Sequence, residues 1–239
     1  MPESADKNIA VHERLIFALD VPTPEDADSV IAELGDSVSF YKLGLQLFMT
    51  GGYFDLVHRL KDRGKKVFVD LKFFDVPATV GRAVKQLEGL GADFATVHGN
   101  DGILKAAADN KGAVQVLAVT ALTSLDRGDL DDLGFQCEVE ELVYSRAKRA
   151  LAAGCDGVVS SGLEAERLRT GLGDKLLIVS PGIRPVENRE ADDQKRVVTV
   201  PDAFKNGADY IVVGRPIRDA ENRKSAAETI QRQIAEVFA

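Results

Sequence analysis

Residues 66–79 read Lys-Val-Phe-Val-Asp-Leu-Lys-Phe-Phe-Asp-Val-Pro-Ala-Thr and combine an apolar run with charged residues at its end. The run Lys66–Leu71 is rich in β-branched and aromatic residues and predicts a strand. Pro77 predicts the start of a helix. Because side chains alternate between the two faces of a strand, Asp70 and Lys72 are expected to point the same way. This segment therefore predicts a βα unit whose strand directs two opposite charges into one pocket.

The same unit recurs along the chain. Short apolar runs, each followed by a polar or glycine-containing turn and then by helical spacing, predict strands at Leu15–Asp20, Ser39–Leu43, Lys66–Leu71, Phe94–His98, Gln115–Thr120, Gly157–Ser160, Leu176–Ser180 and Tyr210–Val213. Helices are predicted to open at Thr23-Pro24 and to cover Glu138–Ala152. Eight parallel strands with intervening helices in 239 residues are typical of an α/β fold of the (β/α)8 TIM-barrel type. No linker divides the chain, so residues 1–239 are predicted to form a single domain.

A doubly wound open sheet would show the same alternation of strands and helices. Its usual Gly-x-Gly-x-x-Gly motif would follow the first strand, where this chain has Leu19-Asp20-Val21-Pro22-Thr23-Pro24. That turn is too rigid and too acidic to hold a pyrophosphate. The pattern therefore favours the barrel.

The composition, 45% apolar and 28% charged, is that of a folded soluble domain. The formal net charge of -8 has the wrong sign for a surface that neutralises many phosphates, so no nucleic-acid partner is expected. No apolar run approaches the ~20 residues of a membrane span and the chain opens without an apolar signal segment, so we expect no membrane association and a cytoplasmic location. Cys137, Cys155 and three scattered histidines form no zinc pattern, and neither a disulfide nor a Cys/His metal centre is expected.

Charged residues fall where the predicted strands end, which is the end at which TIM barrels carry out chemistry. Asp20 closes the first strand and Lys42 lies in the second, while Asp70 and Lys72 end the third. Burying ions costs roughly several kcal/mol each and pairing often only breaks even, so function explains this cluster better than stability. Spacing alone leaves Asp75 open: it is either an acid at the start of the next helix or a group that reaches elsewhere.

Two turns that contain glycine and arginine predict a phosphate site. They are residues 180–185 (Ser-Pro-Gly-Ile-Arg-Pro) and residues 213–217 (Val-Gly-Arg-Pro-Ile), which follow the seventh and eighth strands. Barrel phosphate sites are commonly built from these two loops. Gly214 allows close approach of the backbone, and Arg215 is suited to bidentate contact with a phosphate. A phosphorylated small molecule is therefore the expected ligand.

Other polar residues keep more than one interpretation. His98 is the last residue of the fourth predicted strand. It could serve as an acid/base group, as a hydrogen-bonding partner for a ligand, or as a structural histidine. Thr123 and Ser124 follow the fifth strand and either bind a ligand or form a turn. His12 and His58 are expected at the surface or in structural roles.

Along nearly its whole length the chain resembles the orotidine 5′-monophosphate decarboxylase family. The resemblance is carried by Asp70-x-Lys72-x-x-Asp75 and, in the family's order, by Leu19-Asp20, Tyr41-Lys42-Leu43-Gly44, Pro77-x-Thr79, Leu122-Thr123-Ser124, Pro181-Gly182-Ile183-Arg184-Pro185, Asp193-Gln194 and Gly214-Arg215-Pro216. Phe74 and Ala78 stand where many members have His and Asn, and residues 100–102 (Asn-Asp-Gly) replace a more glycine-rich turn. Neither Phe74 nor Ala78 replaces a charged residue of the central motif.

The resemblance implies decarboxylation of orotidine 5′-monophosphate to uridine 5′-monophosphate in de novo pyrimidine synthesis, without a metal or cofactor. It implies that Lys72 protonates C6 of the pyrimidine after carbon dioxide leaves and that Asp70 lies against the departing carboxylate. Asp20 and Lys42 are implied to contact the ribose hydroxyls and to complete the charge network, Lys42 thereby serving both catalysis and binding.

The rest of the implied site surrounds the nucleotide. Thr123 is assigned to the base, and Arg215 chiefly to the phosphate. The other implied substrate-binding residues are Arg184, Gln194 and Gly214. Asp75, implied to be catalytic, and Thr79, implied to bind substrate, are expected to reach the neighbouring subunit's site in a homodimer.

Two rival functions fit parts of the sequence. A metal-dependent sugar-phosphate decarboxylase or aldol-type synthase on the same barrel shares an Asp-x-Lys-x-x-Asp motif, but a Mg²⁺-bound enediolate requires a carboxylate where this chain has Lys42. A catalytically silent protein that binds sugar phosphates or nucleotides would need only the two arginine loops. Such a protein has no reason to bury the charged cluster.

Overall fold

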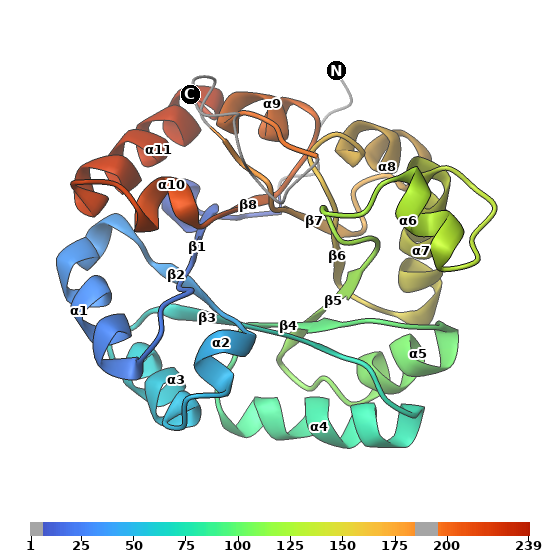
Figure 1. Ribbon diagram of the computed structural model, residues 1–239, viewed down its shortest axis with the longest axis horizontal. Helices are drawn as coiled ribbons and strands as arrows, with labels where there is room; N and C mark the ends of the chain where they lie inside the picture. The colour runs from blue at the N-terminus through green and yellow to red at the C-terminus, as the bar shows by residue number, and fades with distance from the viewer. Residues whose placement is uncertain (1–6, 185–195) are drawn as a thin grey trace.

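The computed structural model describes residues 7–184 and 196–239. Within these ranges eight parallel strands pair in chain order and the last pairs with the first, which closes the barrel seen end-on in Figure 1. The strands are β1 (Leu15–Ala18), β2 (Phe40–Leu43), β3 (Lys66–Phe73), β4 (Phe94–Val97), β5 (Gln115–Val119), β6 (Gly157–Val159), β7 (Leu177–Ser180) and β8 (Tyr210–Val213). The closed barrel confirms the predicted (β/α)8 fold and excludes the open sheet.

Helices surround this barrel on its outer side (Figure 1). They are α1 (Pro24–Leu34), α2 (Leu45–Phe48), α3 (Tyr53–Asp62), α4 (Pro77–Gly89), α5 (Asp101–Asp109), α6 (Arg127–Asp132), α7 (Val139–Ala153), α8 (Ala165–Leu172), α9 (Val200–Lys205), α10 (Arg215–Arg218) and α11 (Arg223–Val237), with the short 3-10 helices η1 (Val11–Glu13) and η2 (Gly35–Ser37). Because all neighbouring strands are parallel, their carboxyl ends lie at one end of the barrel.

The predicted helix starts are confirmed. The Thr23 hydroxyl accepts a hydrogen bond from the amide of Asp26 at 3.1 Å and caps α1, whose first residue is Pro24. Glu138 is the N-cap of α7, and Gly154 ends that helix in a left-handed conformation with φ of 87°.

Two strand boundaries were predicted wrongly by two residues, and the others agree with the structure to within one residue. β1 ends at Ala18 rather than Asp20, because its ladder with β2 stops at the bond from the Leu19 amide to the Lys42 carbonyl. β3 extends past Leu71, because an irregularity in its pairing with β4 is followed by renewed pairing at Phe73.

The strands separate two apolar regions. Inside the barrel the side chains from alternate strand positions pack together; they include Ile16, Phe40, Phe68, Phe94, Leu117, Tyr210 and Val212. The intervening positions, such as Val67 and Val69 around Phe68, pack outward against the helices. Filling both sides of each strand fixes its register, since a slip of one residue would exchange the two sets.

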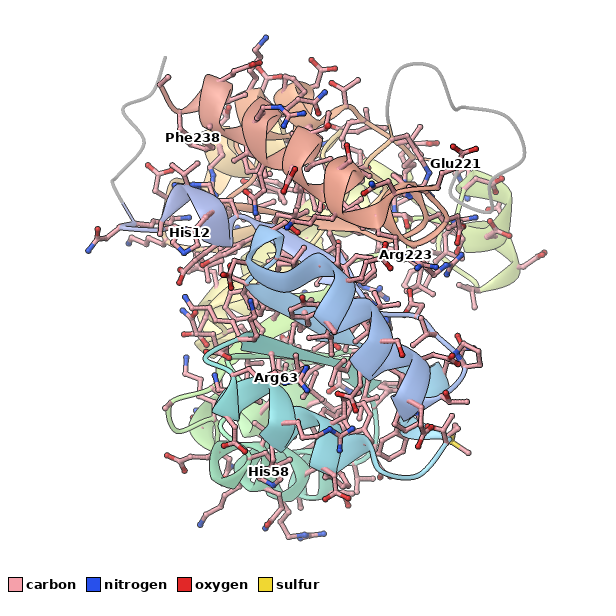
Figure 2. The ribbon with its side chains drawn as sticks, turned by 90° about the vertical axis from the view of Figure 1, so that its left-hand side faces the viewer. His12, His58, Arg63, Glu221, Arg223 and Phe238 are labelled. Atoms are coloured by element: carbon pink, nitrogen blue, oxygen red, sulfur yellow. The ribbon has the colours of Figure 1, made fainter. Side chains whose placement is uncertain are left out.

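The last helix closes the outer layer against the first (Figure 2). Arg223, at the start of α11, pairs through Nη1 with Glu33 of α1 at 2.7 Å. At the other end of α11 the guanidinium of Arg14 lies over the ring of Phe238. His12 in η1 and His58 in α3 are exposed, as one of the two predicted alternatives had it. In the described ranges no helix has the length and apolar character needed to cross a bilayer.

Candidate active site

A cavity of about 300 Å³ opens at the carboxyl ends of the strands. It is lined by Ala18, Asp20, Lys42, Phe68, Asp70, Lys72, Val119, Ala121, Leu122, Thr123, Ser124, Val159, Ser160, Pro181, Gly182, Arg184, Val212, Gly214, Arg215 and Arg218. The strands supply apolar lining residues such as Phe68 and Val212 together with the charged residues Lys42, Asp70 and Lys72, and the loops that follow the strands supply the rest. This volume suits a small polar molecule with an apolar ring.

Four charged side chains alternate in sign along one side of this cavity. Lys42 Nζ lies 3.3 Å from Asp20 Oδ1 and 3.4 Å from Asp70 Oδ2, and Lys72 Nζ lies 3.0 Å from Asp70 Oδ1. Lys42 and Asp70 are only 12% exposed. The structure thus brings together Asp20, Lys42, Asp70 and Lys72 as predicted.

Burial and pairing act in opposite directions on this array. Burial by itself raises the pKa of Asp70, but the charges of Lys42 and Lys72 and hydrogen bonds from Lys72 and Thr96 outweigh it and hold that pKa below its usual range. Burial likewise lowers the pKa of Lys42, and the charges of Asp70 and Asp20 more than reverse this effect. At neutral pH both Lys42 and Asp70 are therefore charged.

The end of β3 is bent so that Lys72 meets Asp70. Lys72 has a φ of 49°, a left-handed conformation that is uncommon for a residue with a side chain. Its amide donates to Thr96 Oγ1 at 2.9 Å, and the same hydroxyl donates to Asp70 Oδ1 at 2.9 Å. Thr96 of β4 therefore holds both the strained backbone and the carboxylate.

The loops after β5, β7 and β8 supply the opposite walls. Thr123, Arg184, Gly214 and Arg215 all line the cavity, in agreement with their predicted places. Arg184 is buried, and its Nη1 donates to the Ile183 carbonyl at 2.8 Å. The predicted Gln194 lies outside the described residues.

Asp75 and Thr79 lie apart from the other predicted residues. Neither lines the cavity, and Asp75 is exposed, its Oδ1 accepting a hydrogen bond from the Val76 amide at 2.6 Å. The neighbouring side chains of Phe74 and Val76 are also exposed. Thr79 accepts a hydrogen bond from Arg82 Nη2 at 3.3 Å.

His98 does not line the cavity either. Its ring packs edge-to-face on Phe74 with the ring centres 5.4 Å apart. Burial, together with the charges of Arg146 and Lys72, lowers its pKa, so the imidazole is mostly neutral at pH 7. These contacts favour the structural interpretation of His98 over the catalytic one.

Three polar residues of the site were missed by sequence reasoning, and one of them, Ser160, lines the cavity directly after β6. Thr96 interrupts the apolar run Phe-Ala-Thr-Val of β4, and this polar interruption was a usable signal. Arg218 lines the cavity one turn after Arg215, and its Nη1 donates to the Asp20 carbonyl at 3.4 Å. The spacing Arg-x-x-Arg at the start of α10 places both guanidinium groups on one side of that turn.

No group of three or more His, Cys, Asp or Glu side chains is arranged to hold a metal ion within residues 7–184 and 196–239. The carboxylates of Asp20 and Asp70 are instead separated by the ammonium group of Lys42. A divalent cation at that point would meet a positive charge.

Known proteins are similar to this chain in sequence and in fold. The model of the orotidine 5′-phosphate decarboxylase / HUMPS family matches residues 13–230. An orotidine 5′-phosphate decarboxylase of Methylococcus capsulatus is 66% identical over 98% of this chain and 97% of its own, and one of Nitrobacter winogradskyi is 49% identical over 100% and 99%. A crystal structure of orotidine 5′-phosphate decarboxylase from Lactobacillus acidophilus superposes with a TM-score of 0.82 at 36% identity, covering 93% of this chain and 99% of that one. The chain therefore belongs to the orotidine 5′-phosphate decarboxylase / HUMPS family.

Proposed function

We propose that this protein is an orotidine 5′-monophosphate decarboxylase, which forms uridine 5′-monophosphate and carbon dioxide in de novo pyrimidine synthesis and uses no metal or cofactor. Relatives named for this activity match the chain over nearly its full length. The observation that carries the proposal is the Lys42–Asp70–Lys72 array, because it supplies fixed charges where the reaction develops charge.

The chemistry needs stabilisation of a carbanion on an sp² carbon. The bond between C6 and the carboxylate breaks, its electron pair stays on C6, and carbon dioxide leaves neutral. In the proposed pose the Lys72 ammonium lies beside C6, where it stabilises the electron pair and then donates the proton that completes uridine 5′-monophosphate. An ammonium held by Asp70 and by the bent end of β3 needs little reorganisation during this step.

Asp70 is proposed to lie against the substrate carboxylate. Since its pKa is held below the usual range, it does not take up a proton to relieve the repulsion between the two carboxylates. That repulsion ends when the substrate carboxylate becomes neutral carbon dioxide. Contacts with Lys42 and Thr96 keep Asp70 in place.

The remaining walls are proposed to bind the rest of the nucleotide. Asp20 and Lys42 contact the ribose hydroxyls, and Thr123 contacts the base. Arg215 binds the phosphate, with Arg184, Gly214 and the predicted Gln194 completing the substrate site. The phosphate lies far from the bond that breaks, and its binding energy lowers the barrier by orienting the ring.

The proposed active form is a homodimer in which Asp75 and Thr79 reach the partner's site. Their position outside the chain's own cavity supports this assignment. Phe74 and Val76 flank Asp75 and expose large apolar side chains, as expected of a surface that another subunit covers. The shared site is a testable property, because it makes activity depend on two chains.

The metal-dependent rival on the same barrel requires a direct test, because the name of the matching family covers more than orotidine 5′-phosphate decarboxylase. Orotidine 5′-monophosphate is added to the protein in the presence of a chelator, and the loss of its ultraviolet absorbance is followed. We expect undiminished conversion to uridine 5′-monophosphate. Activity lost in chelator and restored by Mg²⁺ would favour the metal-dependent rival, and saturable binding without turnover would favour a silent binding protein.

A further inference from the structure

Arg196 joins two walls of the cavity although it does not line the cavity itself. Its Nη1 donates to Glu164 Oε1 at 2.6 Å, and its Nη2 donates to the carbonyl oxygens of Ala121 at 3.2 Å and Leu122 at 2.9 Å. One guanidinium therefore connects the segment before α9, the segment before α8 and the loop after β5.

Both joined loops contribute to the substrate cavity. Ala121 and Leu122 line it and are followed directly by Thr123. On the other side, Val198 forms a bridge with Ile183, and the Arg184 amide donates to the Val198 carbonyl at 3.0 Å. Arg196 lies two residues before this bridge, so it holds the base of the loop that carries Arg184 against the loop that carries Thr123.

The ion pair of Arg196 and Glu164 is deeply buried, and its geometry does not give the largest number of hydrogen bonds between the two side chains. The side chains of Arg196 and Glu164 are 11% and 7% exposed. A side-on pair would use two parallel hydrogen bonds, yet Glu164 Oε2 and Arg196 Nε have no hydrogen-bond partner among the described residues. The guanidinium instead directs its Nη2 to the backbone carbonyls of the loop after β5.

Stability does not explain such an arrangement. Buried ion pairs often contribute nothing over apolar residues of similar volume, and here two polar atoms have no partner within the described part of the chain. The three contacts of Arg196 do fix the position of the loop after β5, which lines the cavity, relative to the segment before α9, which pairs with the loop that carries Arg184. A geometric role therefore accounts for the pair better than an energetic one.

We propose that Glu164 and Arg196 are positioning residues that hold the base-binding loop after β5 against residues 181–184 and 196–199, the two described ends of the substrate-binding loop after β7, so that both ends of the nucleotide are bound at once. The proposal rests on the proposed assignment of Thr123 to the base and of Arg184 to the substrate site. When two contacts are held at a fixed separation, the second forms at little additional entropic cost. Loss of the pair should thus weaken the binding of the whole nucleotide more than the binding of the nucleoside alone.

The test measures binding of uridine 5′-monophosphate and of uridine to Arg196→Met by calorimetry or NMR titration, which do not require turnover. We expect the dissociation constant of the nucleotide to rise at least 10-fold and that of uridine to change less than 3-fold. With orotidine 5′-monophosphate, kcat/KM should fall about 10- to 100-fold, as when a bound group is misplaced by about 1 Å. Glu164→Gln keeps the side-chain volume, and we expect it to shift the ratio of the two constants by at least 3-fold in the same direction.

Arg169→Met is the matched control. Arg169 is equally buried, pairs with Asp209, and donates to the carbonyls of Gly207 and Leu176, but at the opposite end of the barrel. Its loss should lower the unfolding temperature without changing the ratio of nucleotide to nucleoside affinity.

An unchanged ratio in Arg196→Met would overturn the proposal, even if that variant is less stable. If Arg196→Met does not fold, Glu164→Gln decides the question, and an unchanged ratio in that variant would overturn the proposal equally. Failure of the wild-type protein to convert orotidine 5′-monophosphate would refute the decarboxylase assignment instead, and the binding ratios would still report on the pair.

Discussion

Replacing Lys72 by Met tests the proposed mechanism at its centre. The substitution keeps an unbranched side chain of similar length and removes the ammonium group that lies 3.0 Å from Asp70 Oδ1. Two consequences are expected, one for folding and one for catalysis. The structure predicts that they differ greatly in size.

The effect on folding should be small. Lys72 is 34% exposed, so its ion pair is partly screened by solvent and contributes about 1 kcal/mol at most. Asp70 keeps Lys42 at 3.4 Å and the Thr96 hydroxyl at 2.9 Å, and its charge is not left without partners. The variant should therefore fold and still bind uridine 5′-monophosphate.

The effect on catalysis should be large. A unit charge at the 3.0 Å separation seen for Lys72 and Asp70 interacts with roughly 332/(20 × 3.0) ≈ 5.5 kcal/mol at an effective dielectric constant of about 20. Losing an interaction of that size with the carbanion slows decarboxylation by about 10⁴-fold, at about 1.4 kcal/mol per factor of ten. Losing the proton donor adds to this reduction.

The assay is kcat for orotidine 5′-monophosphate, followed by absorbance, beside urea unfolding. Lys66→Met is a matched control: Lys66 begins the same strand, is 35% exposed, and pairs with Glu13 at 2.6 Å. It should lower stability by a similar amount and leave kcat within a few-fold of wild type. A kcat for Lys72→Met within 100-fold of wild type would refute the assigned role of Lys72.

Three further predictions concern the phosphate, the dimer and acid stability. Arg215→Ala should weaken the binding of uridine 5′-monophosphate by roughly 2 to 5 kcal/mol, as measured by calorimetry. An unchanged affinity would show that the phosphate binds elsewhere. Mixing the inactive variants Lys72→Ala and Asp75→Ala should restore about a quarter of wild-type activity, since about half the dimers are mixed and each has one intact site; no recovery after confirmed subunit exchange would refute the shared site. Burial raises the pKa of Asp70, but the charges of Lys42 and Lys72 outweigh burial and hold this pKa below its usual range. The charged carboxylate therefore contributes its full stabilisation above the unfolded pKa of about 3.9, and this stabilisation is lost as the pH falls through the lower pKa of the folded protein. The free energy of unfolding of wild type, relative to that of Asp70→Asn, should therefore be constant above about pH 5 and decline below about pH 4 in urea titrations; a difference that is constant down to pH 2 would contradict the lowered pKa.

The fold and much of the charged site could be predicted because they depend on local periodicity. Strand alternation placed Asp70 and Lys72 on one face, and the rule that barrel chemistry lies at the strand ends added Asp20 and Lys42. Each of these inferences needs only the strand in which the residue lies. The closed barrel then brings the separate strand ends together.

The contacts between loops could not be predicted in this way. Arg196 and Glu164 are 32 positions apart, and their contact depends on the path of two irregular segments. The position of Asp75 depends on how β3 ends, which residue spacing alone did not determine. The polar interruption of β4 by Thr96 marks that residue in the sequence, but its partner Asp70 lies on a different strand and is identified only by the contact in the structure.

The end of β3 also shows why the correct prediction for Lys72 was incomplete. In a regular strand, side chains two positions apart are separated by about 6.6 Å along the strand, so a shared face does not by itself bring Lys72 Nζ to 3.0 Å from Asp70. The structure closes that distance with a left-handed residue at Lys72, which costs roughly 1 to 3 kcal/mol and persists only where other contacts fix it. Thr96 provides those contacts by accepting from the Lys72 amide and donating to Asp70. Pairing resumes at Phe73, where β3 ends, and Asp75 follows outside the cavity that Asp70 and Lys72 share. The strained residue Lys72 therefore lies between the short contact with Asp70 and the end of the strand, beyond which Asp75 no longer faces this cavity.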